Sequence, residues 1–118
     1  SAILLNNLAN LYQREKNPRA LPSAEQAYKL QPKNPAIADT LGWILTEQGN
    51  TTRGLALLGQ ASKAAPRVPE FRYHYAVALA KSGDKARART ELESLLTKAG
   101  PFADRPAAEA MLARLRQP

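Results

Sequence analysis

Apolar residues recur along the chain at intervals of three and four residues, which places them on one face of an α-helix. Two such groups are Leu41, Ile44 and Leu45, and Leu92, Leu95 and Leu96. No segment alternates apolar and polar residues over the length of a strand. Glycines and prolines divide the pattern into segments of about 12 to 16 residues. The pattern therefore predicts an all-α chain of short helices joined by tight turns.

The pattern repeats with a period of 34 residues. Shifting the chain by this period aligns residues of similar size, and the aligned sets are Ala20, Gly54 and Ala88; Pro32 and Pro66; Gly42 and Ala76; and Gly49-Asn50 and Gly83-Asp84. In the first unit the pattern of the first helix is shifted by one residue toward the C-terminus, so that its small residue is Ala9. We therefore predict three helical hairpins near residues 1–34, 35–68 and 69–102.

A helix-turn-helix unit of this length, with a large apolar and then a small residue in its first helix and a closing proline, resembles the tetratricopeptide repeat. The resemblance implies a single domain over residues 1–118, built as an α-α superhelix. In such a superhelix the small residues of the two helices face each other, which lets the helix axes approach closely. We expect the contacts Gly42 with Gly54, Ala9 with Ala20, and Ala76 with Ala88.

Two segments depart from the repeat. Residues 104–116 match no earlier unit, and their one-sided apolar stripe predicts a helix that caps the C-terminal end of the array. Asp104 is the expected N-cap of this helix, and Phe102 is expected beneath it. Pro22 lies where the second helix of unit one should already run, so we expect that helix to start late, with Pro22 in its first turn.

The charge and the reactive residues narrow the function. The net charge is +7 with a pI of about 10.1, but the basic residues are scattered, which is typical of solvated helix faces. The chain has no cysteine, and its only histidine is His74, for which we expect a structural or groove-lining role. The acids form no compact cluster and the glycines form no phosphate loop. We predict no catalytic residues, no metal site and no cofactor.

The tetratricopeptide resemblance implies a concave groove lined by the first helix of each unit. The residues that it assigns to binding in this groove are Asn6, Asn10, Gln13, Asp39, Trp43, Glu47, Tyr73, His74 and Lys81. The same helix faces carry Asn7, Arg14, Ala36, Thr40, Thr46, Glu70 and Val77. Amide side chains can bond the backbone of an extended peptide, and an exposed Trp43 can anchor it. Alternatively, Trp43 packs between neighbouring helices and the asparagines are only solvated.

Longer stretches carry a closer resemblance. The stretches "NPAIADTLGWILTEQGNTTRGLALLGQASKAAP", "PEFRYHYAVALAKSGDKARARTELESLL" and "FADRPAAEAMLARL" resemble the C-terminal end of the tetratricopeptide-repeat lipoprotein of bacterial PEP-CTERM/exosortase systems. This implies a lipid-anchored, exported parent in the cell envelope, linked to exopolysaccharide production and surface-protein sorting. The chain begins at Ser1 rather than methionine, so we expect a piece of a longer protein.

Three functions stay open on the sequence alone. The first is a non-catalytic scaffold that binds a protein or an extended peptide. The second is binding of a carbohydrate polymer along the groove, with Trp43 and Tyr73 stacking on sugar faces. The third is association with a polyanion or a membrane surface through the positive charge, which should weaken steeply between about 50 and 200 mM salt. No specific nucleic-acid site and no transmembrane segment are expected in this part of the chain.

Overall fold

Helix boundaries follow the punctuation of the sequence. At one start, the Asn34 side chain accepts a hydrogen bond from the Ala36 amide, and Pro35 occupies the first helical position. The computed structural model describes residues 1–118 and contains seven helices and no strand. Their bounds are α1 Ala2–Arg14, α2 Ala20–Leu30, α3 Pro35–Glu47, α4 Thr51–Ala64, α5 Pro69–Lys81, α6 Lys85–Lys98 and α7 Arg105–Leu115.

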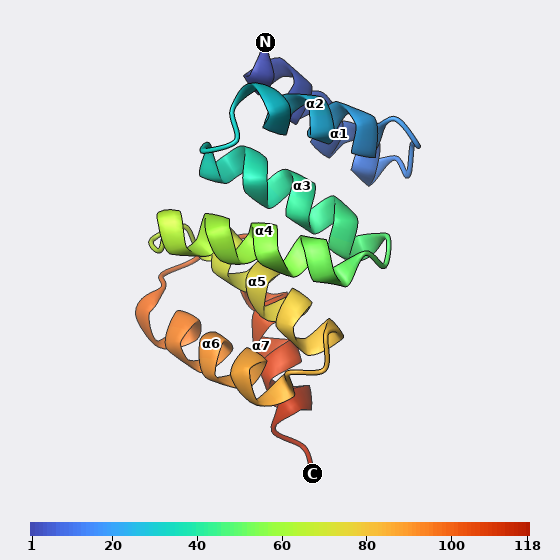
Figure 1. Ribbon diagram of the computed structural model, residues 1–118. Coiled ribbons are helices and arrows are strands. Elements are labelled where there is room, and N and C mark those ends of the chain that lie inside the picture. The colour runs from blue at the N-terminus through green and yellow to red at the C-terminus, as the bar shows by residue number, and fades with distance from the viewer.

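The helices form three antiparallel hairpins that stack in chain order, with α7 against α6 at the C-terminal end. Figure 1 shows the two termini at opposite ends of an array that measures 43 × 26 × 23 Å. The predicted all-α superhelix is confirmed. None of the helices is long and apolar enough to cross a membrane.

The turns inside the three hairpins share one backbone geometry. Gly49 and Gly83 end α3 and α5 with φ angles of 92° and 97°, a region that glycine enters without steric cost. In the first hairpin the corresponding residue is Lys16, whose φ is 55°. The amide after it, that of Asn17, bonds the Tyr12 carbonyl at 2.8 Å. Lys16 therefore adopts a left-handed conformation that its Cβ disfavours.

We expect Lys16→Gly to raise the free energy of unfolding by about 0.5 to 1 kcal/mol, because glycine removes the Cβ strain at the cost of some chain entropy. Lys16→Ala is the matched control, since it removes the charge and keeps the Cβ. Urea unfolding of both variants measures the effect. Equal stabilities for the two variants would contradict this explanation.

The second helix of the first hairpin starts late, as the position of Pro22 predicts. α2 begins at Ala20, so Pro22 is the third residue of its first turn. The lack of an N–H at this position costs nothing, because the first amides of a helix have no partner within the helix. The Ser23 amide then bonds the Arg19 carbonyl at 3.1 Å.

The second hairpin closes around two glycines. A Cβ added to Gly42 would lie 3.1 Å from the Gly54 carbonyl oxygen and 2.8 Å from Leu58 Cγ. A Cβ added to Gly54 would lie 2.8 Å from the Gly42 carbonyl oxygen. α3 and α4 therefore meet at these residues, as the repeat register predicts, and the glycine inside α3 permits this approach. The small residues at the equivalent positions are fully buried, namely Ala9, Ala20, Ala76 and Ala88.

The apolar core runs along the array as separate clusters. The largest unites the first two hairpins through residues such as Leu41, Ile44 and Ala24. A second cluster joins α5, α6 and α7, and Phe102 packs against it beneath α7, as expected. Each hairpin thus buries its apolar face only with its neighbours, which is typical of a solenoid.

The capping helix is fixed by Arg105 rather than by an N-cap bond. Asp104 stands at the N-cap position, as expected, but its side chain accepts no capping hydrogen bond. The Arg105 guanidinium instead donates to the carbonyls of Leu96, Ala99 and Gly100 at 3.0, 2.9 and 3.2 Å. These groups include carbonyls at the end of α6, so Arg105 joins α6 to α7.

We expect Arg105→Ala to lower the free energy of unfolding by about 2 kcal/mol, because hydrogen bonds from a charged donor are stronger than neutral ones. Arg114→Ala is the control on the same helix, since it removes the same charge without these bonds. Thermal and urea unfolding give the difference. If Arg114→Ala costs as much, the effect comes from charge alone.

Candidate functional site: a groove across the first helices

A groove of 830 Å³ crosses the first helices of the three hairpins. Its walls come from α1, α3, α5 and the turn before α7, and the lining residues are Asn7, Asn10, Gln13, Arg14, Lys16, Trp43, Glu47, His74 and Asp104. Five of the residues assigned to binding from the sequence lie here, namely Asn10, Gln13, Trp43, Glu47 and His74. Asn7 and Arg14, predicted on the same helix faces, are also part of the lining.

The other predicted groove residues lie elsewhere. Asp39 is buried beneath His74 with 7% of its surface exposed. Tyr73 packs against the C-terminal core cluster, and Lys81 is exposed at the end of α5. Asn6 is half-buried, and its Oδ1 atom is buried without a hydrogen-bond partner. These four residues do not line the groove.

Thr46 was also placed on the groove side by the sequence, and this is wrong. It is 1% exposed, and its hydroxyl donates to the Gly42 carbonyl at 2.8 Å, in contact with Gly54. The close approach of α3 and α4 turns this face of α3 toward α4. Thr46 therefore belongs to the interface between the two helices.

Polar side chains connect α1 to α3 along the groove. Asn10 Nδ2 donates to Thr40 Oγ1 at 3.2 Å, and the Thr40 hydroxyl donates to the Ala36 carbonyl at 3.0 Å. Gln13 Nε2 donates to Glu47 Oε1 at 3.1 Å. These bonds hold the amide groups at fixed positions on the groove floor, while part of each amide's bonding capacity stays free.

Trp43 and His74 form the aromatic centre of the groove. Their rings stack with centroids 4.0 Å apart and planes inclined by 19°. Trp43 on α3 therefore packs against α5, the first helix of the next hairpin, and it also lines the groove. The sequence alternatives of packing and exposure are thus combined. Behind this pair, His74 Nδ1 lies 2.9 and 3.0 Å from the two Asp39 carboxylate oxygens. Because a carboxylate only accepts, Nδ1 carries the proton and donates it.

The charges around His74 are mainly negative. Burial raises the pKa of the Asp39 carboxyl, the hydrogen bond from His74 opposes that rise, and the carboxylates of Glu70 and Asp104 add to it. Burial also raises the pKa of the Tyr73 phenol, and Asp104 adds to this while Arg114 opposes it. Asp104 lies 4.0 Å from His74 Nε2. The carboxylates of Asp39 and Asp104 therefore lie on two sides of a single imidazole, at Nδ1 and Nε2.

The sequence analysis missed two groove residues, Lys16 and Asp104. Asp104 is the one that lies beside His74. It stands outside the repeats, so the repeat register gives no signal for it, and its position before a helix indicates an N-cap. The stacking of α7 on the third hairpin instead brings its carboxylate beside His74. Only the three-dimensional arrangement reveals this role.

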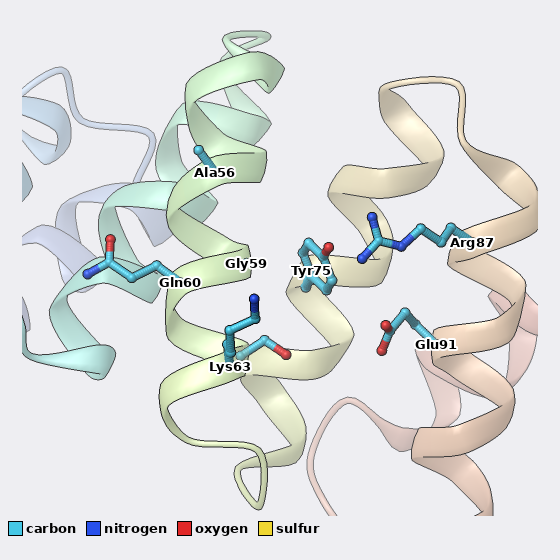
Figure 2. Close-up of a pocket in the computed structure, with 8 residues that line it drawn as sticks. Ala56, Gly59, Gln60, Lys63, Tyr75, Arg87 and Glu91 are labelled. Carbon is cyan, nitrogen blue, oxygen red and sulfur yellow. The ribbon is translucent and has the colours of Figure 1, made fainter.

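A second cavity of 420 Å³ lies between α4, α5 and α6. Figure 2 shows the Tyr75 ring facing Gly59, with Arg87 reaching toward it from α6. The Arg87 guanidinium lies 5.8 Å from the ring centroid, and a Cβ on Gly59 would lie 3.3 Å from Tyr75 Cε1. Gly59 therefore makes room for the ring, and this cavity was not predicted from the sequence. Across the chain, no group of three or more acidic or histidine side chains is arranged to hold a metal ion.

Stacked helical hairpins with a groove across their first helices define an α-solenoid with a concave binding surface. A family model described as the tetratricopeptide repeat matches residues 40–104, which is more than half of the chain. The chain belongs to the tetratricopeptide repeat family. No curated protein matches its sequence.

Several solved structures share the fold. An O-GlcNAc transferase mutant from Thermobaculum terrenum has a TM-score of 0.83 at 23% identity, over 97% of this chain and 22% of the transferase. The Yersinia enterocolitica type III secretion chaperone SycD, in complex with a peptide of the translocator YopD, has a TM-score of 0.77 at 21% identity, over 96% of this chain and 90% of SycD. A tetratricopeptide repeat protein from Parabacteroides merdae has a TM-score of 0.75 at 22% identity, over 98% of this chain and 45% of that protein. The chain thus spans about a fifth of the transferase and under half of the last protein.

Proposed function

We propose that this domain is a non-catalytic scaffold that binds an extended segment of a partner protein in the groove across α1, α3 and α5. The observation that carries the proposal is the groove itself, which has an aromatic centre at Trp43 and a floor of fixed amides. Asn10 and Gln13 retain bonding capacity that can pair with the peptide backbone of a ligand. The SycD structure contains a bound YopD peptide, which supports peptide binding by this fold.

A displayed library of random peptides, selected on the purified domain, tests this proposal. The bound peptides are then mapped by NMR through the indole N–H of Trp43 and the side-chain amides of Asn10 and Gln13. We expect these signals to shift, and we expect the double variant Asn10→Ala, Gln13→Ala to weaken binding about tenfold, since two peptide-bonding groups are lost.

The matched control is the double variant Ser62→Ala, Lys63→Ala in the cavity of Figure 2, which lies away from the groove. This variant should bind the selected peptides as the unaltered domain does. If the control variant weakens the binding of the selected peptides and the groove variant does not, the groove is not the binding site.

We further propose that the parent is an exported, lipid-anchored bacterial protein of the cell envelope, linked to exopolysaccharide and PEP-CTERM surface sorting. The support is the resemblance of units two and three and the final helix to the lipoprotein of those systems. The parent should then begin with a lipoprotein signal, and palmitate fed to the cells should label it. An unlabelled parent without such a signal would refute this proposal.

Binding of an exopolysaccharide in the same groove is the alternative function. It is favoured by Trp43, whose ring could stack on a sugar face at the groove centre. Titration of neutral and acidic polysaccharide fragments should then change the fluorescence of Trp43, which is the only tryptophan. If no fragment changes this signal, the alternative is excluded and the protein scaffold stands.

A further inference from the structure

The acids of this basic chain differ in their partners. Outside the groove, the acids with an ion pair are paired with arginine, namely Glu25 with Arg53, Glu91 with Arg72, Glu93 with Arg89 and Arg116, and Glu109 with Arg105. Inside the groove region, Asp39 and Asp104 contact only His74, and Glu47 accepts a bond only from the neutral Gln13. The groove acids therefore lack the arginine partners of these four acids, as do Glu15, Glu70 and Asp84 outside the groove.

The uncompensated charge lies beside the aromatic centre of the groove. Glu47 is one helical turn after Trp43 on α3, so the two side chains share a face. Asp104 reaches the same groove from the other side, beside the His74 ring that stacks on Trp43. An indole ring flanked by carboxylates attracts a cation through its π-face and through charge together.

The α1 side of the groove carries basic residues. Arg14 and Lys16 line it at the end of α1, and neither forms an ion pair. These two residues repel a cation from the α1 end, and they leave the Trp43 end as the place where one is stable. Glu47 lies close to them, since it accepts the bond from Gln13 and lines a small pocket together with Lys16, so the Asp104 side is the more negative side of the groove.

Building on the proposed peptide-binding function, we infer that the groove takes a lysine or arginine side chain of the partner segment against Trp43, between Glu47 and Asp104. The cation supplies the charge that the groove acids lack. It also fixes the direction of the bound segment, because its basic residue must lie toward α5 and away from Arg14.

Small probes test the inference without knowledge of the partner. Nα-acetyl-arginine N-methylamide and its lysine counterpart are titrated into labelled domain, and the norleucine and glutamate counterparts are titrated in parallel. We expect the two cationic probes to shift the Trp43 indole N–H saturably, and the norleucine and glutamate probes to leave it unchanged. Equal shifts from norleucine, or none from the cationic probes at the highest soluble concentration, would overturn the inference.

Asp104→Asn should lower the affinity of the cationic probes by about two- to fivefold, which is the usual range for one partly exposed charge pair. Asp104 makes no capping bond, so this variant keeps the start of α7 intact. Glu109→Gln removes the same charge from α7 outside the groove, and it should leave the affinity unchanged. An equal loss in both variants would mean that only the net charge matters, and the site would be rejected.

The outcome also separates this inference from the proposed function. Peptides that bind in the groove and lose no affinity when their lysines and arginines are replaced by norleucine or citrulline would disprove the inference alone. Absence of any peptide bound in the groove would disprove the proposed function.

Discussion

Gly54→Ala is expected to lower the free energy of unfolding by about 3 kcal/mol, although alanine is the better helix former. The new Cβ would lie 2.8 Å from the Gly42 carbonyl oxygen and 3.0 Å from the Thr46 amide nitrogen, and it would also overlap the Thr46 hydroxyl. Two of these three atoms belong to the backbone of α3, so no side-chain rotation relieves the clash. The helices must separate, and the bond between the Thr46 hydroxyl and the Gly42 carbonyl must break.

Gly59→Ala on the same helix is the matched control. Its Cβ would lie 3.3 Å from a ring carbon of Tyr75, a side chain that can shift, and alanine contributes about 1 kcal/mol of helix propensity. We expect its net effect to stay within about 1 kcal/mol of zero. Urea unfolding of the three proteins, with the slope of the transition compared, gives the values. If Gly54→Ala is as stable as Gly59→Ala, close packing of α3 on α4 is not what requires glycine.

The fold could be predicted from the sequence because it repeats. Each unit presents the same punctuation and the same small residues, so an ambiguous position in one unit is resolved by its equivalent in the next. Gly42 illustrates this, since its place beside Gly54 follows from the register alone. The attachment of α7 could not be predicted in the same way. Arg105 bonds three carbonyls of the preceding segment, and no second copy of that segment reveals the pattern.

The candidate site was predictable only as far as each helix acts alone. The register correctly places Trp43 and His74 in the groove, because both lie on the exposed face of a first helix. It fails for Asp39, which lies on the same face, because the neighbouring hairpin lays His74 over it. Tyr73 fails for a similar reason, since the C-terminal cluster withdraws it from the groove. Burial by a neighbouring unit depends on how the hairpins stack in the superhelix. The residue pattern of a single helix carries no information about that stacking.

His74→Ala is expected to lower the free energy of unfolding by about 3 kcal/mol at neutral pH. The change removes the stacking on Trp43 and the hydrogen bonds at 2.9 and 3.0 Å that compensate the Asp39 carboxylate. Asp39 is only 7% exposed, so water cannot replace the lost donor without local rearrangement. Fluorescence of Trp43 during urea unfolding reports both the loss of the stack and the stability.

The pH dependence of this loss distinguishes the charge of Asp39 from simple packing. Burial raises the pKa of Asp39 and His74 opposes the rise, so removal of His74 must raise that pKa further above the ordinary value of 3.8. A carboxyl whose pKa is raised by folding favours the folded state below pH 3.8 and loses this contribution as pH rises through its folded pKa. The cost of His74→Ala should therefore be smallest near about pH 3 and grow toward neutral pH.

In the background Asp39→Asn, which has no charge to strand, the same substitution should cost an amount that does not change with pH, equal to the packing and stacking lost. A cost of His74→Ala that is constant with pH in both backgrounds would contradict a buried, ionised Asp39 held by His74.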